Sequence, residues 1–103
     1  MTTPEGKVKD RIDKVLKLYG AYWFKPVQTG IGTRTLDYIC CYVGNFFAIE
    51  AKSGALHMTD NQRMIAQSMR KAGAKVFEIN EDTGVAELEA WLRSVKPTAE
   101  WKG

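Results

Sequence analysis

Asp37, Glu50 and Lys52 combine residue types and a spacing that could do chemistry on a phosphate group. Glu50 and Lys52 are two positions apart, so in an extended strand they share one face, with Cα atoms roughly 6.6 Å apart. Asp37 precedes Glu50 by 13 positions, a separation that a hairpin can close. The three charged ends can therefore meet at one reacting group.

The same segment also supplies the oxygen ligands that Mg²⁺ prefers. The carboxylates of Asp37 and Glu50, with the backbone carbonyl of Ala51, would leave coordination positions for water and phosphate. We therefore expect a Mg²⁺ (or Mn²⁺) site at these three residues. Such an ion polarises a phosphodiester and lowers the pKa of a bound water, while Lys52 holds the nucleophile or offsets developing charge.

An ordinary exposed strand end is the alternative for Glu50 and Lys52, and spacing alone leaves both interpretations open. The pair ends the apolar run 46–49, which has the character of a buried strand. Asp37 directly precedes another β-rich run, although aspartate is depleted in strands. Such local conflicts are typical of functional sites.

A hairpin is the element that must position these residues. Residues 37–43 and 46–52 are rich in strand-forming side chains, and the intervening Gly44-Asn45 is well suited to a tight turn. The sequence therefore predicts that one strand carries Asp37 and the other carries Glu50 and Lys52.

Helices are predicted on both sides of this hairpin. Thr3 and Pro4 favour a helix start, apolar residues at helical spacing continue it over residues 5–19, and Gly20 favours its end. Thr59 and Gln62 have the form of a capping box, which predicts a second helix that ends near Gly73.

The remaining pattern predicts two further strands and a last helix. Residues 21–25 and 75–79 are β-like, 28–36 and 81–84 are a loop and a turn, and an amphipathic helix covers about residues 85–95. The order is αβββαβα. It predicts one α/β domain over residues 1–103, with a central sheet covered by helices and disorder only at residues 1–2 and after Lys96.

Composition is that of one globular domain: 103 residues, of which 45% are hydrophobic and 26% charged. No leader or long apolar segment is seen, so we expect a cytoplasmic protein without membrane contact. Cys40 and Cys41 are expected to be reduced core residues. Basic residues prevail before residue 78 and acidic ones after it, which suits a polyanionic partner and equally a mixed solvated surface.

The chain resembles the PD-(D/E)xK nucleases and, within them, the compact VRR-NUC domains found as standalone phage and bacterial proteins. The likeness covers about residues 5–80 and lies in Leu36-Asp37, the run Ile49-Glu50-Ala51-Lys52, an early Glu5, the loop 30–32 and the helix start 59–62. It implies a restriction-endonuclease-like αβββαβ core with a mixed central sheet flanked by helices.

The resemblance also implies an activity and its residues. Asp37, Glu50 and the Ala51 carbonyl would bind metal, Lys52 would be catalytic, and Glu5 and Gln62 would complete the site. A Mg²⁺- or Mn²⁺-dependent deoxyribonuclease is expected, acting as a homodimer on duplex or branched DNA such as junctions, in a bacterium or phage-infected host. The chain departs from the family by having Arg34-Thr35-Leu36-Asp37 where Gly-x-Pro-Asp is frequent.

DNA-binding residues are expected beside the carboxylates. Arg34, Lys25 and Arg63 would contact phosphates without reading sequence. Trp23 and Phe24 could stack on bases, although packing against the first helix is the favoured interpretation.

Two expectations concern the surface and the single histidine. His57 is left out of the site because a lone loop histidine is usually solvated. Ile31, Met58 and Trp101 are candidates for a surface between two copies. A non-catalytic nucleic-acid-binding module and a structural interaction subunit remain the alternative functions.

Overall fold

The computed structural model describes residues 3–27 and 34–103 of the chain. The elements follow the predicted order αβββαβα and confirm the α/β class with a mixed sheet flanked by helices. They are α1 (Pro4–Tyr19), β1 (Tyr22–Phe24), β2 (Tyr38–Tyr42), β3 (Asn45–Ala51), α2 (Asp60–Lys71), β4 (Lys75–Ile79) and α3 (Val85–Ser94).

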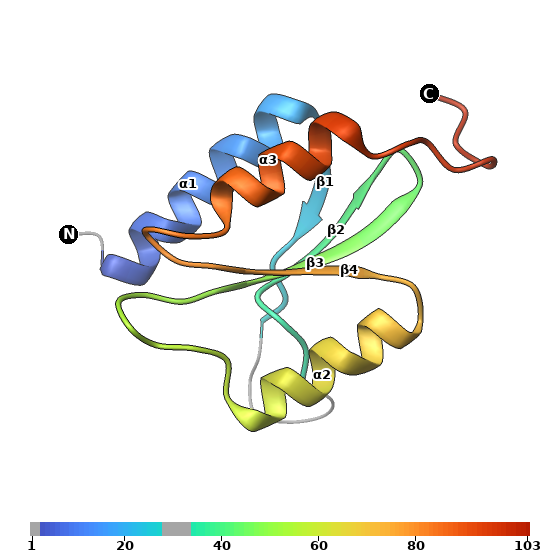
Figure 1. Cartoon of the computed structure of the whole chain (residues 1–103). Helices are drawn as coiled ribbons and strands as arrows, with labels where there is room; N and C mark the ends of the chain where they lie inside the picture. The colour runs from blue at the N-terminus through green and yellow to red at the C-terminus, as the bar shows by residue number, and fades with distance from the viewer. Residues whose placement is uncertain (1–2, 28–33) are drawn as a thin grey trace.

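The strands lie in the order β1-β2-β3-β4. β1, β2 and β3 pair antiparallel, and β4 pairs parallel with β3 after the α2 crossover. Figure 1 shows α1 and α3 on one face of the sheet and α2 on the other. β3 is therefore an inner strand covered on both faces, and it is the strand that carries Glu50.

Local signals determine where α1 and α2 begin. The Thr3 hydroxyl accepts a hydrogen bond from Gly6 N–H at 3.0 Å and caps α1. In α2 the capping box is complete, because Gln62 N–H donates to Thr59 Oγ1 at 3.2 Å and Thr59 N–H donates to Gln62 Oε1 at 3.0 Å. Gly20 ends α1 in the left-handed conformation, as the pattern predicts.

The hairpin turn lies one residue earlier than predicted. Tyr42 pairs with Asn45, so Val43 and Gly44, at φ 44° and 87°, form the two-residue turn in place of Gly44-Asn45. The Asn45 amide instead donates to Val43 O at 3.3 Å and to Lys96 O at 3.0 Å. A one-residue move of the turn shifts the register by two, which brings Asp37 next to Glu50.

Two apolar clusters fill the layers on either side of the sheet. The one beneath α1 and α3 includes Phe47, whose ring centroid lies 4.9 Å from that of Trp91. The one beneath α2 comprises Leu36, Ala48, Met58, Ala66 and Val76. Met58 is 7% exposed and so fills this chain's own core. Its expected place on a surface between two copies is wrong.

The C-terminal tail packs on the hairpin turn, contrary to the predicted disorder after Lys96. Thr98 N–H donates to Val43 O at 3.0 Å, and Trp101 N–H donates to Thr98 O at 3.1 Å. The tail is held because the turn presents carbonyl groups to it. Trp101 remains 45% exposed.

The two aromatic residues of β1 and the two cysteines of β2 differ in burial. Trp23 packs against the α1 and α3 side of the core, whereas Phe24 is exposed. Cys40 is buried as expected, but Cys41 is exposed because neighbouring residues in β2 face opposite ways. The predictions at residues 1–2 and 30–32, Ile31 included, lie outside the described residues. In the described part of the chain, no helix is long and apolar enough to cross a membrane.

Candidate active site

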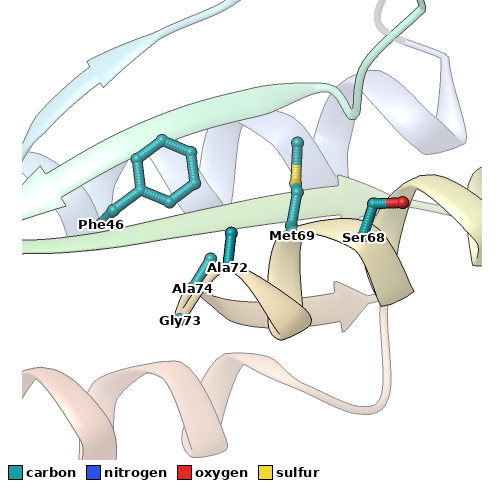
Figure 2. Close-up of a pocket in the computed structure, with 6 residues that line it drawn as sticks. All are labelled: Phe46, Ser68, Met69, Ala72, Gly73 and Ala74. Carbon is teal, nitrogen blue, oxygen red and sulfur yellow. The ribbon is translucent and has the colours of Figure 1, made fainter.

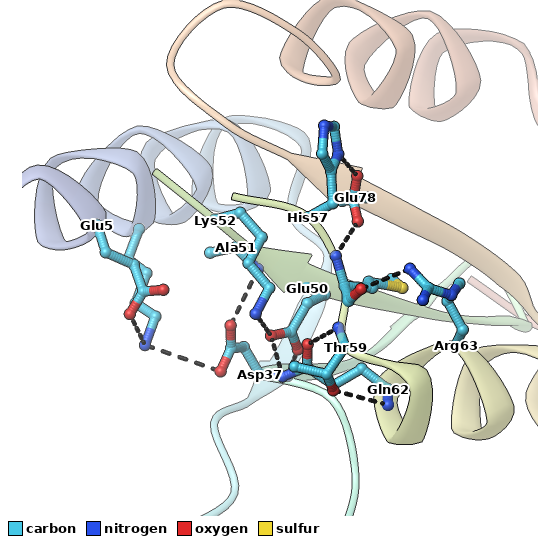
Figure 3. A network of polar contacts seen from close by, with 12 residues as sticks. Glu5, Asp37, Glu50, Ala51, Lys52, His57, Thr59, Gln62, Arg63 and Glu78 are labelled. Carbon is cyan, nitrogen blue, oxygen red and sulfur yellow. Dashed lines mark hydrogen bonds and ion pairs between the residues drawn. The ribbon is translucent and has the colours of Figure 1, made fainter. Parts of the chain in front are cut away.

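Asp37 and Glu50 lie side by side where β2 begins and β3 ends. Asp37 N–H donates to Glu50 Oε1 at 3.1 Å, and Ala51 N–H donates to Asp37 Oδ2 at 2.9 Å. Figure 3 shows the side chains of Asp37, Glu50 and Lys52 directed toward one another. The structure thus brings together the acids and the lysine that the sequence singles out.

Gln62, in the first turn of α2, orients Glu50 from the helix layer that covers this face of the sheet. Its Nε2 donates to Glu50 Oε2 at 2.9 Å, while its Oε1 accepts the Thr59 N–H of the capping box. One amide therefore links the start of α2 to the carboxylate on β3. The structure thus places the Gln62 amide beside Glu50.

Burial, together with the negative charge of Asp37, raises the pKa of Glu50 to about 7, against the opposing effects of Lys52 and the Asp37 N–H. The residue is 3% exposed, and Lys52 Nζ lies 3.5 Å from its Oε2. Near neutral pH this carboxylate is therefore poised to take up either a proton or a cation.

The oxygen atoms present suit a hard divalent cation. N–H and C=O groups of one strand residue face the same neighbour, so the Ala51 carbonyl lies on the side to which its N–H donates, that of Asp37. Two carboxylates, of which Glu50 has a pKa raised by burial and by the charge of Asp37, and one carbonyl match the ligand preference of Mg²⁺. Asp37, Glu50 and Ala51 therefore fit such an ion.

Among the residues that the structure describes, Glu5 is linked to this centre through Lys9. Lys9 Nζ lies 3.8 Å from Glu5 Oε2 and 3.8 Å from Asp37 Oδ1. Within residues 3–27 and 34–103, no three acidic, histidine or cysteine side chains gather at one point, so Glu5 is not a third carboxylate on the pair. Sequence reasoning missed Lys9, although its four-residue spacing from Glu5 places both on one face of α1.

Glu78 is a second residue that sequence reasoning missed. It pairs directly with Glu50 across the parallel β3–β4 contact. It accepts hydrogen bonds from Met58 N–H at 2.8 Å and interacts with His57 Nδ1 at 3.2 Å. Although burial favours its neutral form, the bond from Met58 and the contacts with His57 and Lys52 hold the pKa of Glu78 below its ordinary value. No sequence signal gives the register of a crossover strand.

The three basic residues expected to contact DNA differ in their partners within the chain. Lys25 Nζ lies 2.7 Å from Asp13 Oδ2. Arg63 donates to Met58 O at 2.6 Å and pairs with Asp60. Arg34 is exposed and lines a pocket of about 240 Å³ beside Gln62. Of the three, Arg34 is the one that lines this pocket.

A larger pocket, of about 470 Å³, lies at the other end of α2 (Figure 2). None of the acids or lysines described above lines it. Its walls are Phe46, Ser68, Met69, Ala72, Gly73 and Ala74.

Comparisons of the chain with protein-family models, with curated proteins and with solved structures found no match. The interpretation of the site therefore depends on its residues and their geometry.

Proposed function

We propose that this chain is a metal-dependent nuclease of the PD-(D/E)xK type that hydrolyses phosphodiester bonds in DNA. The observation that carries the proposal is the contact of Asp37 with the buried Glu50, with Lys52 Nζ 3.5 Å from Glu50. A buried carboxylate beside a second acid costs stability, and groups with strongly shifted pKa values concentrate at functional sites.

Each residue has a separate role in this proposal. Bound Mg²⁺ or Mn²⁺ would polarise the scissile phosphate and lower the pKa of a water molecule. Asp37, Glu50 and the Ala51 carbonyl would hold the ion. Lys52 positions the attacking water or offsets charge that develops on the phosphate. Gln62 keeps Glu50 in the orientation that binding requires.

DNA as substrate is supported by the distribution of charge. The basic excess of the chain lies before residue 78, in the part that holds the acid pair. Lysine and arginine on that part would offset the phosphates of a bound strand. Branched DNA is included among the proposed substrates.

One observation favours the alternative of a nucleic-acid-binding module without cleavage. Both carboxylates have partners within the chain, namely backbone N–H groups, the Gln62 amide and lysine ammonium groups. Such a satisfied network could serve stability alone. Cleavage assays distinguish the two functions.

The test compares wild type with Asp37→Asn and Glu50→Gln on labelled duplex, flap and four-way-junction DNA with Mg²⁺ or Mn²⁺. Asp10→Asn is the matched control, because Asp10 is an exposed acid of α1 without a polar partner among the residues described. We expect the control to cleave like wild type and both site variants to lose at least about 10²-fold in rate, with DNA binding in EDTA retained.

Two results would contradict the proposed nuclease function. Binding without cleavage by wild type on every substrate would indicate the binding module. No binding at all would favour a structural interaction subunit.

A further inference from the structure

A pocket of about 240 Å³ opens beside the acid pair, where the segment leading to Asp37 meets the first turn of α2. It shares Gln62 with the proposed active site, since Gln62 Nε2 donates to Glu50, and Figure 3 shows Gln62 and Thr59 next to Glu50. A ligand in the pocket would lie one side chain away from Glu50. Its walls are Arg34, Thr35, Thr59, Asn61, Gln62 and Ile65.

We propose that this pocket binds one unpaired nucleobase of the DNA strand whose phosphate lies at Asp37 and Glu50. This inference rests on the proposed nuclease function and names its substrate class: DNA with an unpaired nucleotide beside the cut. The residues that would recognise the base are Arg34 and Asn61, with Ile65 against its ring.

Two walls of the pocket offer hydrogen-bonding groups to a ligand. Arg34 and Asn61 are both exposed, and within residues 3–27 and 34–103 neither side chain has a hydrogen bond or ion pair. A guanidinium group is a planar fork of donors, and an amide offers both donors and an acceptor. Together they match the edge of a base, which also carries donors and acceptors.

The charge at the pocket favours a base over a phosphate group. Arg34 is the one cationic residue among those lining the pocket. Nearby Arg63 is held by Asp60 and by Met58 O. Asp60, exposed at the start of α2, offsets the charge of Arg63 in this ion pair. The surroundings are thus close to neutral, which suits a neutral ligand with polar edges.

An apolar surface for the ring continues from the pocket. Ile65 is half-buried in its wall. A second hollow of about 230 Å³ shares Arg34, Asn61 and Ile65 and extends to Met64, which is 65% exposed. A flat base can contact these aliphatic side chains through its face while Arg34 and Asn61 meet its edge.

A preference among DNA structures follows from the shape of the site. A base that is paired and stacked in a duplex cannot enter a recess of this size unless it is extruded, which costs free energy. Unpaired bases in flaps, gaps and branch points do not bear that cost. The enzyme should therefore bind and cut such DNA in preference to a perfect duplex.

The test measures binding in EDTA by fluorescence anisotropy, which separates it from catalysis. The probes are a flap oligonucleotide, the same flap with an abasic site at the unpaired nucleotide, and the perfect duplex. The variants are Arg34→Ala and Asn61→Ala. Gln67→Ala is the matched control, because Gln67 is exposed on α2 and does not line the pocket.

We expect wild type and Gln67→Ala to bind the intact flap about tenfold more tightly than the abasic flap or the duplex. Both pocket variants should lose about that factor on the intact flap and little on the other probes. 2-Aminopurine at the unpaired position should change its fluorescence on binding to wild type and much less with Asn61→Ala.

Equal affinity of wild type for intact and abasic flaps would overturn the base pocket. If Arg34→Ala then weakened both equally, the pocket would be a phosphate contact. In either case, the proposed nuclease function would still stand if wild type cleaved DNA with Mg²⁺ and Glu50→Gln did not. Absence of any DNA binding would overturn both proposals.

Discussion

Glu50 is the one charged side chain that is buried among the described residues, and its neighbours determine its charge state. Burial and Asp37 favour the neutral acid, whereas Lys52 and the Asp37 N–H favour the carboxylate. The result is a pKa of about 7 in place of 4.5. Without metal, this residue should therefore make stability depend on pH.

We predict that Glu50→Gln stabilises the metal-free protein at pH 8. The folded pKa lies above the unfolded one, so the contribution of Glu50 is fully present below pH 4.5 and is lost as pH rises through about 7. At pH 8 the variant should exceed wild type by up to about 3 kcal/mol. Urea denaturation in EDTA at several pH values measures this difference, and parallel pH profiles for the two proteins would contradict the raised pKa.

Lys52 should matter more for the chemical step than for metal affinity, because an ammonium group acts on phosphate or nucleophile and is not a ligand. We expect Lys52→Ala to lose about 10²–10³-fold in kcat at pH 8, with Mg²⁺ affinity close to that of wild type. Calorimetry and single-turnover cleavage measure the two quantities.

The control for Lys52 is Lys71→Ala, which removes an exposed lysine of α2. It should leave both kcat and Mg²⁺ affinity unchanged. An equal loss of Mg²⁺ binding in Lys52→Ala and Glu50→Gln would be inconsistent with the roles assigned to them.

Among the elements, the β2–β3 hairpin has the largest influence on the site. Its turn at Val43-Gly44 sets the register in which Tyr38 faces Ile49. One step further along the strands, the same register brings Asp37 against Glu50. The turn lies at the opposite end of β2 and β3 from the acid pair, yet a change of register there would separate the two carboxylates.

Gly44→Ala should destabilise the fold for two reasons. Gly44 has φ 87°, which an alanine adopts at a cost of about 1–2 kcal/mol. A Cβ at this position would also collide with the Thr98 hydroxyl of the tail, and overpacking of this kind costs about 1–3 kcal/mol more. Urea denaturation measures the free energy of unfolding.

Gly20→Ala is the matched control for Gly44→Ala, since Gly20 has φ 76° and no atom within 4 Å of an added Cβ. It should show the backbone cost alone. Adding Thr98→Ala to Gly44→Ala should recover part of the loss, and a double-mutant cycle measures that part. Equal losses at Gly20 and Gly44 would mean that the tail does not pack on the turn.

At the scale of the whole molecule, the site lies where the layers meet. Lys9 comes from α1, Asp37 from the start of β2, Glu50 from β3 and Gln62 from α2. Helices on both faces of the sheet therefore contribute to one centre. Relative movement of the α1 and α2 layers would change the distances from Lys9 and from Gln62 to the acid pair.

We predict a homodimer, because in the proposed nuclease one acid pair would cut one strand, and paired cuts in a duplex or junction would need two. Two-fold dimers are the commonest oligomers of soluble proteins. With Met58 buried, the exposed Leu18, Tyr22 and Phe24 near the end of α1 and the edge strand β1 are where we expect contact. Light scattering should give twice the chain mass of 11.6 kDa. The 11.6 kDa mass both free and bound to junction DNA would exclude a dimer.

The sequence by itself determined the element order and the shared face of Glu50 and Lys52. Both follow from local rules: apolar spacing and caps for the helices, and alternation of side chains along a strand. Thr59 and Gln62 form their capping box from residues three apart, so no distant contact was needed to foresee it.

Only the tertiary structure decided the hairpin register, the partners of the charged residues and the charge state of Glu50. Residue preferences along the sequence cannot predict Val43 in a turn, because the C-terminal tail helps to hold that turn. Thr98 N–H donates to Val43 O, and the Asn45 amide donates to Lys96 O. The pKa of Glu50 depends on burial between β2, β4 and α2, which no short segment contains. Charge and register are properties of the assembled layers, and for that reason they became visible only in the fold.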